Sequence, residues 1–175
     1  MDLYGTRQLV DGMRAVRDDT IQIASDIPES SYDYRPTPET RSVSDTLVHI
    51  AWLWNFDRYL HDEAHLDSLE EVDFGAVIAQ SRAEEMRQRS KSEIIELLRT
   101  EGERSLKWIE QLPDELLAER IRMPGGGSTT RFEMLLGTKE HEIHHRSQLT
   151  VLQRLLGIVP HFTRMQGAEV ADAAS

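Results

Sequence analysis

The residues best suited to chemistry lie in the pentapeptide HEIHH, residues 141 to 145. His141 and His145 are four residues apart, so on a helix their side chains lie about 40° apart and share one face. Two imidazoles in this arrangement are able to bind one metal ion. The letters also match the H-E-x-x-H motif of zinc metalloproteases, in which the glutamate is the general base. The position of a third ligand decides between a protease and another kind of metal site.

The protease interpretation lacks a suitable third ligand downstream. The metzincin motif requires a glycine and a histidine at positions where this chain has Gln148 and Val151. A downstream glutamate ligand would have to be Glu169, close to the end of the chain. A di-iron site built from two Glu-x-x-His motifs is also disfavoured, because the second motif would be Asp62-x-x-His65. The third ligand is therefore expected upstream.

His49 is the best upstream ligand because it lies on the apolar face of another helical segment. Its neighbours on that face are Trp52, Leu53 and Phe56. His141 and His145 also lie in an apolar stripe, since Met134 and Leu152 fall within about 20° of His141. Three imidazoles facing the interior of one protein need polar partners, and a divalent cation satisfies all three. The pattern predicts a metal site formed by His49, His141 and His145, with an open coordination position for water or substrate.

Other polar residues near these histidines have weaker assignments. His144 falls at the edge of the stripe and is expected to be a bystander. Glu142 is interpreted as an ordinary surface carboxylate, with a general base or a support for the site as the alternative. Gln148 lies close to the histidine face and is a candidate hydrogen-bond partner of a ligand. His61 and His65 turn away from the apolar face, so both are expected at a solvated helix end.

Four segments with helical periodicity are available to position these residues. The first has an apolar stripe and ends before Pro28; its stripe is Leu9, Met13, Val16, Thr20, Ile23 and Ile27. The second, DTLVHIAWLWNFDRYL, follows Ser44 as its N-cap. The third runs to Leu112 and the fourth to Gly157, with Pro160 just beyond. These last two segments open with the capping boxes Ser90-x-x-Glu93 and Thr130-x-x-Glu133.

Four helices of about 20 residues, joined by some long connections, indicate an all-α four-helix bundle. The stretch ERIRMPGGGSTTRFE predicts a short irregular hairpin-like segment before the last helix. Its GGGSTT lacks the Lys-Ser/Thr ending of a phosphate-binding P-loop, so a flexible connection is the better interpretation. We expect one domain over residues 1–165 and a flexible C-terminal tail over residues 166–175.

Composition excludes several kinds of partner and site. The 31 acidic and 20 basic residues give a formal charge of −11, which repels nucleic acids and anionic lipids, so neither is an expected partner. The absence of cysteine excludes disulfides, a thiolate zinc site and a cysteine nucleophile. There is no signal-peptide pattern and no apolar run of membrane-spanning length. We therefore expect a soluble, cytoplasmic protein.

Two stretches resemble the DinB/YfiT-like family of metal-binding four-helix bundles, and the resemblance extends over most of the chain. They are YRPTPETRSVSDTLVHI and KEHEIHHRSQLTVLQRLLGIVP. The second is similar to the family's H-x-x-x-H-R-G-Q-L signature with a glycine and proline exit, although Ser147 stands where glycine is usual. The resemblance assigns the metal to His49, His141 and His145. It also implies an up-down-down-up arrangement of long helices and a homodimer.

The family includes thiol transferases that use low-molecular-weight thiols such as bacillithiol or mycothiol, a mycothiol-dependent isomerase, and proteins described as metal-dependent hydrolases. The resemblance therefore favours a metal-dependent enzyme, a thiol S-transferase or hydrolase, that activates a water or thiol nucleophile against a small-molecule substrate. The alternative is a non-catalytic, metal-binding or small-ligand-binding, stress-related dimer. Imidazole accepts zinc, nickel and iron, so the ligands leave the identity of the divalent metal open.

Overall fold

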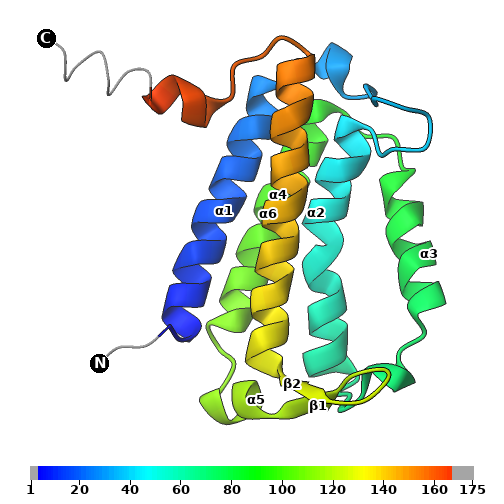
Figure 1. Cartoon of the computed structure of the whole chain (residues 1–175), viewed down its shortest axis with the longest axis vertical. Helices are drawn as coiled ribbons and strands as arrows, with labels where there is room; N and C mark the ends of the chain where they lie inside the picture. The colour runs from blue at the N-terminus through cyan, green and yellow to red at the C-terminus, as the bar shows by residue number, and fades with distance from the viewer. Residues whose placement is uncertain (1–3, 167–175) are drawn as a thin grey trace, which may run out of the picture.

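The computed structural model describes residues 4–166, and four long helices form its centre (Figure 1). They are α1 (Thr6–Asp26), α2 (Val43–Arg58), α4 (Lys91–Ile109) and α6 (Arg131–Leu155). Helices α1 and α2 each contact both α4 and α6, so the bundle closes around one shared interior. The four helices run up, down, down and up in chain order, as the resemblance implied. The predicted all-α four-helix bundle is confirmed.

The capping residues that the sequence predicted lie at both ends of α6, the helix that carries two of the candidate ligands. Both predicted capping boxes form, at the start of α4 and at the start of α6. Helix α6 ends at Leu155, and Gly157, the residue after its C-cap Leu156, has a φ of 77°. The amide of Gly157 donates to the Arg154 carbonyl, and the amide of Ile158 donates to the Gln153 carbonyl. This pair of hydrogen bonds is a Schellman motif, in which glycine adopts the left-handed conformation without strain.

Two helix boundaries differ from the prediction. Ser42, and not Ser44, is the N-cap of α2, because Asp45 then occupies the third helical position and completes a capping box. Ser44 would instead have placed an apolar residue at that position. Helix α4 ends at Ile109 rather than Leu112, since the last residues switch to hydrogen bonds between positions three apart.

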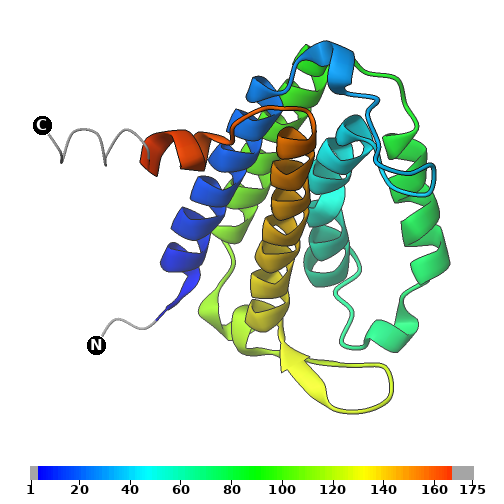
Figure 2. The same ribbon diagram turned by 45° about the horizontal axis from the view of Figure 1, so that its top comes forward.

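A further helix, α3 (Phe74–Glu85), lies on the outer side of α2 and was not expected from the sequence (Figures 1 and 2). Its N-cap is Asp73, whose carboxylate accepts a hydrogen bond from the amide of Ala76. None of its residues is buried, so it lacks the core-facing stripe by which the other helices were identified. Helix α3 returns the chain to the other end of the bundle, which is why α2 and α4 run in the same direction.

The end of α2 widens into a π-helical segment, η2 (Tyr59–Glu63). The buried side of α2 includes Ile50, Trp54 and Asp57, and His61 follows Asp57 by four residues on the same side of the helix. His61 therefore faces the interior on this buried side and is 1% exposed, with its Nε2 3.6 Å from Asp57 Oδ1 and its Nδ1 3.1 Å from Arg131 Nη1. The expected solvated position is therefore wrong for His61 and correct for His65, which is exposed.

A two-stranded antiparallel hairpin precedes α6, as predicted. Strand β1 (Arg120–Arg122) pairs with β2 (Ser128–Thr130). The three consecutive glycines, residues 125–127, all have positive φ values in the turn, a conformation that other residues rarely adopt. The remaining short elements are η1 (Glu29–Ser31), η3 (Leu69–Glu71) and α5 (Asp114–Ala118).

No helix among residues 4–166 is long and apolar enough to cross a membrane. The boundaries of the single domain expected over residues 1–165 stay a prediction. Most of the tail expected over residues 166–175 lies outside the described residues, which end at Gln166.

Arg17 of α1 connects all four long helices at the centre of the bundle. Its guanidinium donates to the Leu98 carbonyl of α4 at 2.8 Å and to the Ile50 carbonyl of α2 at 3.3 Å. It also forms two hydrogen bonds of 2.8 Å with the carboxylate of Glu142 on α6. Ile50 and Glu142 are each adjacent in sequence to a candidate metal ligand, so this buried cluster holds in place the two helices that carry the site.

Candidate metal centre

The three predicted histidines meet between α2 and α6. His49, His141 and His145 each offer a nitrogen, and these three atoms lie within 4.8 Å of one another. The Nε2 atoms of His141 and His145 are 2.8 Å apart, one helical turn from each other on α6. The ring of His49 lies 4.7 Å from that of His145 and 5.6 Å from that of His141, measured between centroids. The periodicity thus selected the histidines that the fold brings together.

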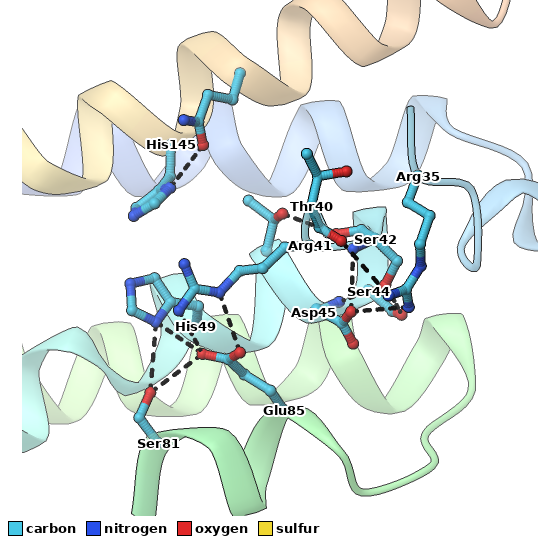
Figure 3. Close-up of polar contacts among 12 residues, drawn as sticks. Arg35, Thr40, Arg41, Ser42, Ser44, Asp45, His49, Ser81, Glu85 and His145 are labelled. Atoms are coloured by element: carbon cyan, nitrogen blue, oxygen red, sulfur yellow. Dashed lines mark hydrogen bonds and ion pairs between the residues drawn. The ribbon is translucent and has the colours of Figure 1, made fainter. Parts of the chain in front are cut away.

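Residues of α3 hold the ring of His49. Its Nδ1 lies 3.0 Å from Glu85 Oε1 and 3.4 Å from Ser81 Oγ (Figure 3). Burial acts to raise the pKa of Glu85, but the hydrogen bonds with His49 and Arg41 outweigh it and lower that pKa to about 2. Glu85 is therefore an ionised acceptor, and Nδ1 of His49 must carry the proton that it donates. That tautomer leaves the Nε2 lone pair of His49 available to a metal.

Gln148 performs the same task for His145. Its side-chain oxygen lies 2.8 Å from Nδ1 of His145 (Figure 3). An amide oxygen only accepts, so Nδ1 of His145 donates and Nε2 carries a lone pair. The amide nitrogen of Gln148 lies 3.0 Å from Nε2 of His144, which is exposed and stays outside the trio. Gln148 thus occupies the supporting position that the sequence suggested.

The two candidate ligands on α6, His141 and His145, favour the neutral form that metal binding requires. Burial lowers the pKa of His145 to about 4, and the nearby His49, His141 and Arg41 act in the same direction, against the hydrogen bond that His145 donates to Gln148. Burial, together with His49 and His144, also lowers the pKa of His141. Both rings are therefore deprotonated at neutral pH.

The donor set fits a divalent transition metal. The bare Nε2 of His145 lies 2.8 Å from Nε2 of His141, a separation that requires a proton or a cation between them. Three neutral imidazoles suit zinc, nickel or iron(II), and three protein ligands leave room for an exogenous one. His141 is exposed, so the centre is accessible from one side.

A pocket of about 540 Å³ opens onto the centre between α2 and α3. His49 and His141 form part of its wall, together with Trp52, Leu53 and Phe56. These three apolar residues share the face of His49 that was expected to point into the core, but they are only partly buried. A larger cavity of about 810 Å³ lies near the α1–α2 connection and includes none of the three histidines.

Glu142 is neither exposed nor directed at the trio. It is 2% exposed, so its interpretation as an ordinary surface carboxylate is wrong. Its carboxylate accepts two hydrogen bonds from Arg17 and one of 3.0 Å from Thr20 Oγ1, both on α1. The reason is that Glu142 lies about 100° around α6 from His141, which directs it to α1. Its carboxylate is committed to a buried ion pair.

Sequence reasoning missed two residues that support the site. Arg17 carried a signal, because it lies four residues after Met13 and three before Thr20, within an apolar stripe where an unpaired cation would be costly. Glu85 carried no such signal, because its contact with His49 exists only where α3 packs on α2.

Comparisons with known proteins agree with this fold. A sequence profile described as the DinB superfamily matches residues 13–149. The chain is 27% identical over 157 residues to YjoA of Bacillus subtilis strain 168, described as an uncharacterized protein, covering 87% of this chain and 91% of YjoA. The crystal structure of YjoA superposes with a TM-score of 0.63, covering 86% of this chain and 92% of that one at 24% identity.

Two more distant solved structures share the fold. YfiT from Bacillus subtilis, described as a probable metal-dependent hydrolase with an unusual four-helix bundle topology, has a TM-score of 0.67 at 15% identity, covering 90% of this chain and 91% of YfiT. A mycothiol-dependent maleylpyruvate isomerase has a TM-score of 0.62 at 12% identity, covering 83% of this chain and 61% of the isomerase. At these identities the likeness concerns the fold alone.

Proposed function

The chain belongs to the DinB superfamily, and we propose that it is a metal-dependent enzyme of the thiol transferase or hydrolase type. The observation that carries this proposal is the set of three imidazole nitrogens within 4.8 Å of one another beside an open pocket. His49, His141 and His145 would hold one divalent ion, either zinc, nickel or iron. A bound ion of this kind lowers the pKa of a coordinated water or thiol and so supplies a nucleophile near neutral pH.

The protein's own residues orient and protect this chemistry. Glu85 and Gln148 fix the tautomers of His49 and His145, so that both present a lone pair to the same point. The chain has no cysteine, so any thiol nucleophile must come from a low-molecular-weight cosubstrate. Glu142 receives no proton-transfer role in this proposal, because Arg17 and Thr20 engage its carboxylate.

The named relatives support both versions of the reaction. YfiT is described as a probable metal-dependent hydrolase, and the isomerase is described as mycothiol-dependent. A hydrolase uses water as its nucleophile, and a mycothiol-dependent enzyme uses a thiol. A metal ion held by three histidines is able to activate either nucleophile.

We also propose that the protein is a homodimer. Supporting this, Val151, Leu155 and Val159 are more than half exposed along the outer side of α6 and the segment after it. Val151 and Leu155 are one turn apart on the same side of α6, and exposed apolar side chains that gather in this way often mark a contact surface.

The proposal is tested first by metal content. We expect one equivalent of metal in the purified protein and in His144→Ala, which changes a neighbouring histidine outside the trio. His49→Ala, His141→Ala and His145→Ala should each lower zinc affinity strongly in calorimetric titrations. Unchanged stoichiometry and affinity in His49→Ala would show that the site is assigned wrongly.

Turnover is tested next with the metal present. The protein is screened with several low-molecular-weight thiols and an electrophile, and then with ester and amide substrates. Activity that requires metal and disappears in His145→Ala supports the enzyme. Tight metal binding with no turnover in any screen would favour the non-catalytic binding protein instead.

A further inference from the structure

The pocket beside the histidines has apolar walls that are only partly covered by the rest of the fold. Helix α3 carries Phe74, Val77 and Ile78 at the i, i+3, i+4 spacing of one helix face, yet none of its residues is buried. Phe74 is 42% exposed and Ile78 is 53% exposed, although both line the pocket. Trp52 and Phe56 of α2 form the facing wall. Apolar side chains gathered around a cavity of about 540 Å³, and left accessible, are the usual lining of a small-molecule site.

The pocket has a defined direction, because α2 and α3 run in opposite directions. At one end Glu85 of α3 contacts His49 of α2 at 3.0 Å. At the other end the ring of Phe74 lies 6.0 Å from that of Phe56, seven residues further along α2. Seven helical residues span roughly 10 Å. The accessible apolar surface is therefore elongated and begins at the metal centre.

Charge divides the two ends of the pocket. Arg41 and Arg82 line it beside the histidines, whereas Glu63 and Asp73 line it at the far end. Arg41 is paired with Glu85 at 3.0 Å. Arg82 is exposed and, within residues 4–166, forms no ion pair. An arginine without a carboxylate partner is suited to bind one.

We propose that this pocket binds an apolar carboxylate, a medium-length chain or aromatic ring with one anionic group. The carboxylate pairs with Arg82 at the histidine end, and the apolar part lies between the aromatic residues of α2 and α3. This assignment rests on the proposed function, since it names the class of substrate or product that the metal centre would act on. The overall charge of −11 repels anions at long range, so the selectivity must come from this local arginine.

The test compares three probes with the same ten-carbon chain: decanoate, decanol and decylammonium, all below their aggregation concentrations. Binding is measured by calorimetry with the purified full chain and again after metal chelation. We expect decanoate to bind most tightly in both forms. Arg82→Gln should weaken decanoate binding roughly tenfold or more, the effect of losing one charged hydrogen bond, and leave decanol unchanged. Arg99→Gln, which changes an exposed arginine on α4, is the matched control and should change neither.

Phe74→Ala provides a second, independent variant and should weaken decanoate and decanol alike. Decanoate binding that is no tighter than decanol binding, or that is equal in wild type and Arg82→Gln, would overturn the proposal. Equal losses in Arg82→Gln and Arg99→Gln would also overturn it, because they would indicate a general charge effect. The metal-stripped measurement separates this inference from the proposed function: selective decanoate binding without metal-dependent turnover would refute only the enzyme.

Discussion

The buried ion pair between Arg17 and Glu142 allows a sharp test of the role of Glu142. Glu142→Leu approximately keeps the side-chain volume but removes the only carboxylate among the described residues that the Arg17 guanidinium contacts, and the guanidinium would remain charged in the interior with the Leu98 and Ile50 carbonyls as its remaining acceptors. The two side chains are 6% and 3% exposed, so solvent does not screen the loss. Removing one partner of a buried pair costs about 3–5 kcal/mol. The loss corresponds to a fall in melting temperature of about 6 to 20 °C for a chain of this length.

The assay is chemical denaturation followed by circular dichroism, with metal content measured on the same samples. Glu140→Leu, which changes an exposed acid on the same helix, is the control and should lie within about 0.5 kcal/mol of wild type. The double variant Arg17→Met with Glu142→Leu should be more stable than Glu142→Leu alone, because it no longer buries an unpaired cation.

Two results would refute this reasoning. One is a cost below about 1 kcal/mol for Glu142→Leu, which would mean that the pair is not desolvated as described. The other is unchanged stability combined with complete loss of turnover, which would restore Glu142 as a catalytic residue.

Three further predictions concern the metal centre and the outer face of α6. Glu85→Ala should weaken zinc binding about 10-fold to 100-fold, because the ring of His49 loses the acceptor that orients it. Glu84→Ala, one residue earlier, is the control and should not weaken zinc binding. Equal zinc affinities of Glu85→Ala and wild type would contradict the supporting role of Glu85. Burial lowers the pKa of His145 from 6.5 to about 4 in the folded protein. As the pH falls, the unfolded chain therefore takes up a proton on His145 at a higher pH than the folded protein does. The metal-free protein should consequently lose stability as the pH falls from 6.5 to 4, and His145→Ala should flatten that dependence in denaturation curves; an equal slope in both would refute it. Leu155→Glu should convert the proposed dimer to monomers in light scattering, and a wild-type protein that is already monomeric would exclude the dimer.

Local interactions explain which parts of the fold were predictable. Capping boxes and apolar periodicity involve residues three and four apart, so the chain carries them wherever the helix packs. The capping boxes of α4 and α6 and the exit at Gly157 followed directly from such short-range patterns. The shared face of His141 and His145 also follows from a local pattern, because a regular helix fixes the angle between residues four apart.

The sequence by itself therefore determined the helix class, the three histidines that the fold brings together and the hairpin before α6. Only the tertiary structure decided the rest, because those features depend on contacts between distant segments. Helix α3 buries no side chain, and its position brings Glu85 to His49, 36 residues away in sequence. The packing of α2 buries the side with Ile50, Trp54 and Asp57 rather than the apolar side next to His49, and His61 lies on that buried side. Glu142 became a buried partner of Arg17 for the same reason: its environment is made by α1, 125 residues away along the chain.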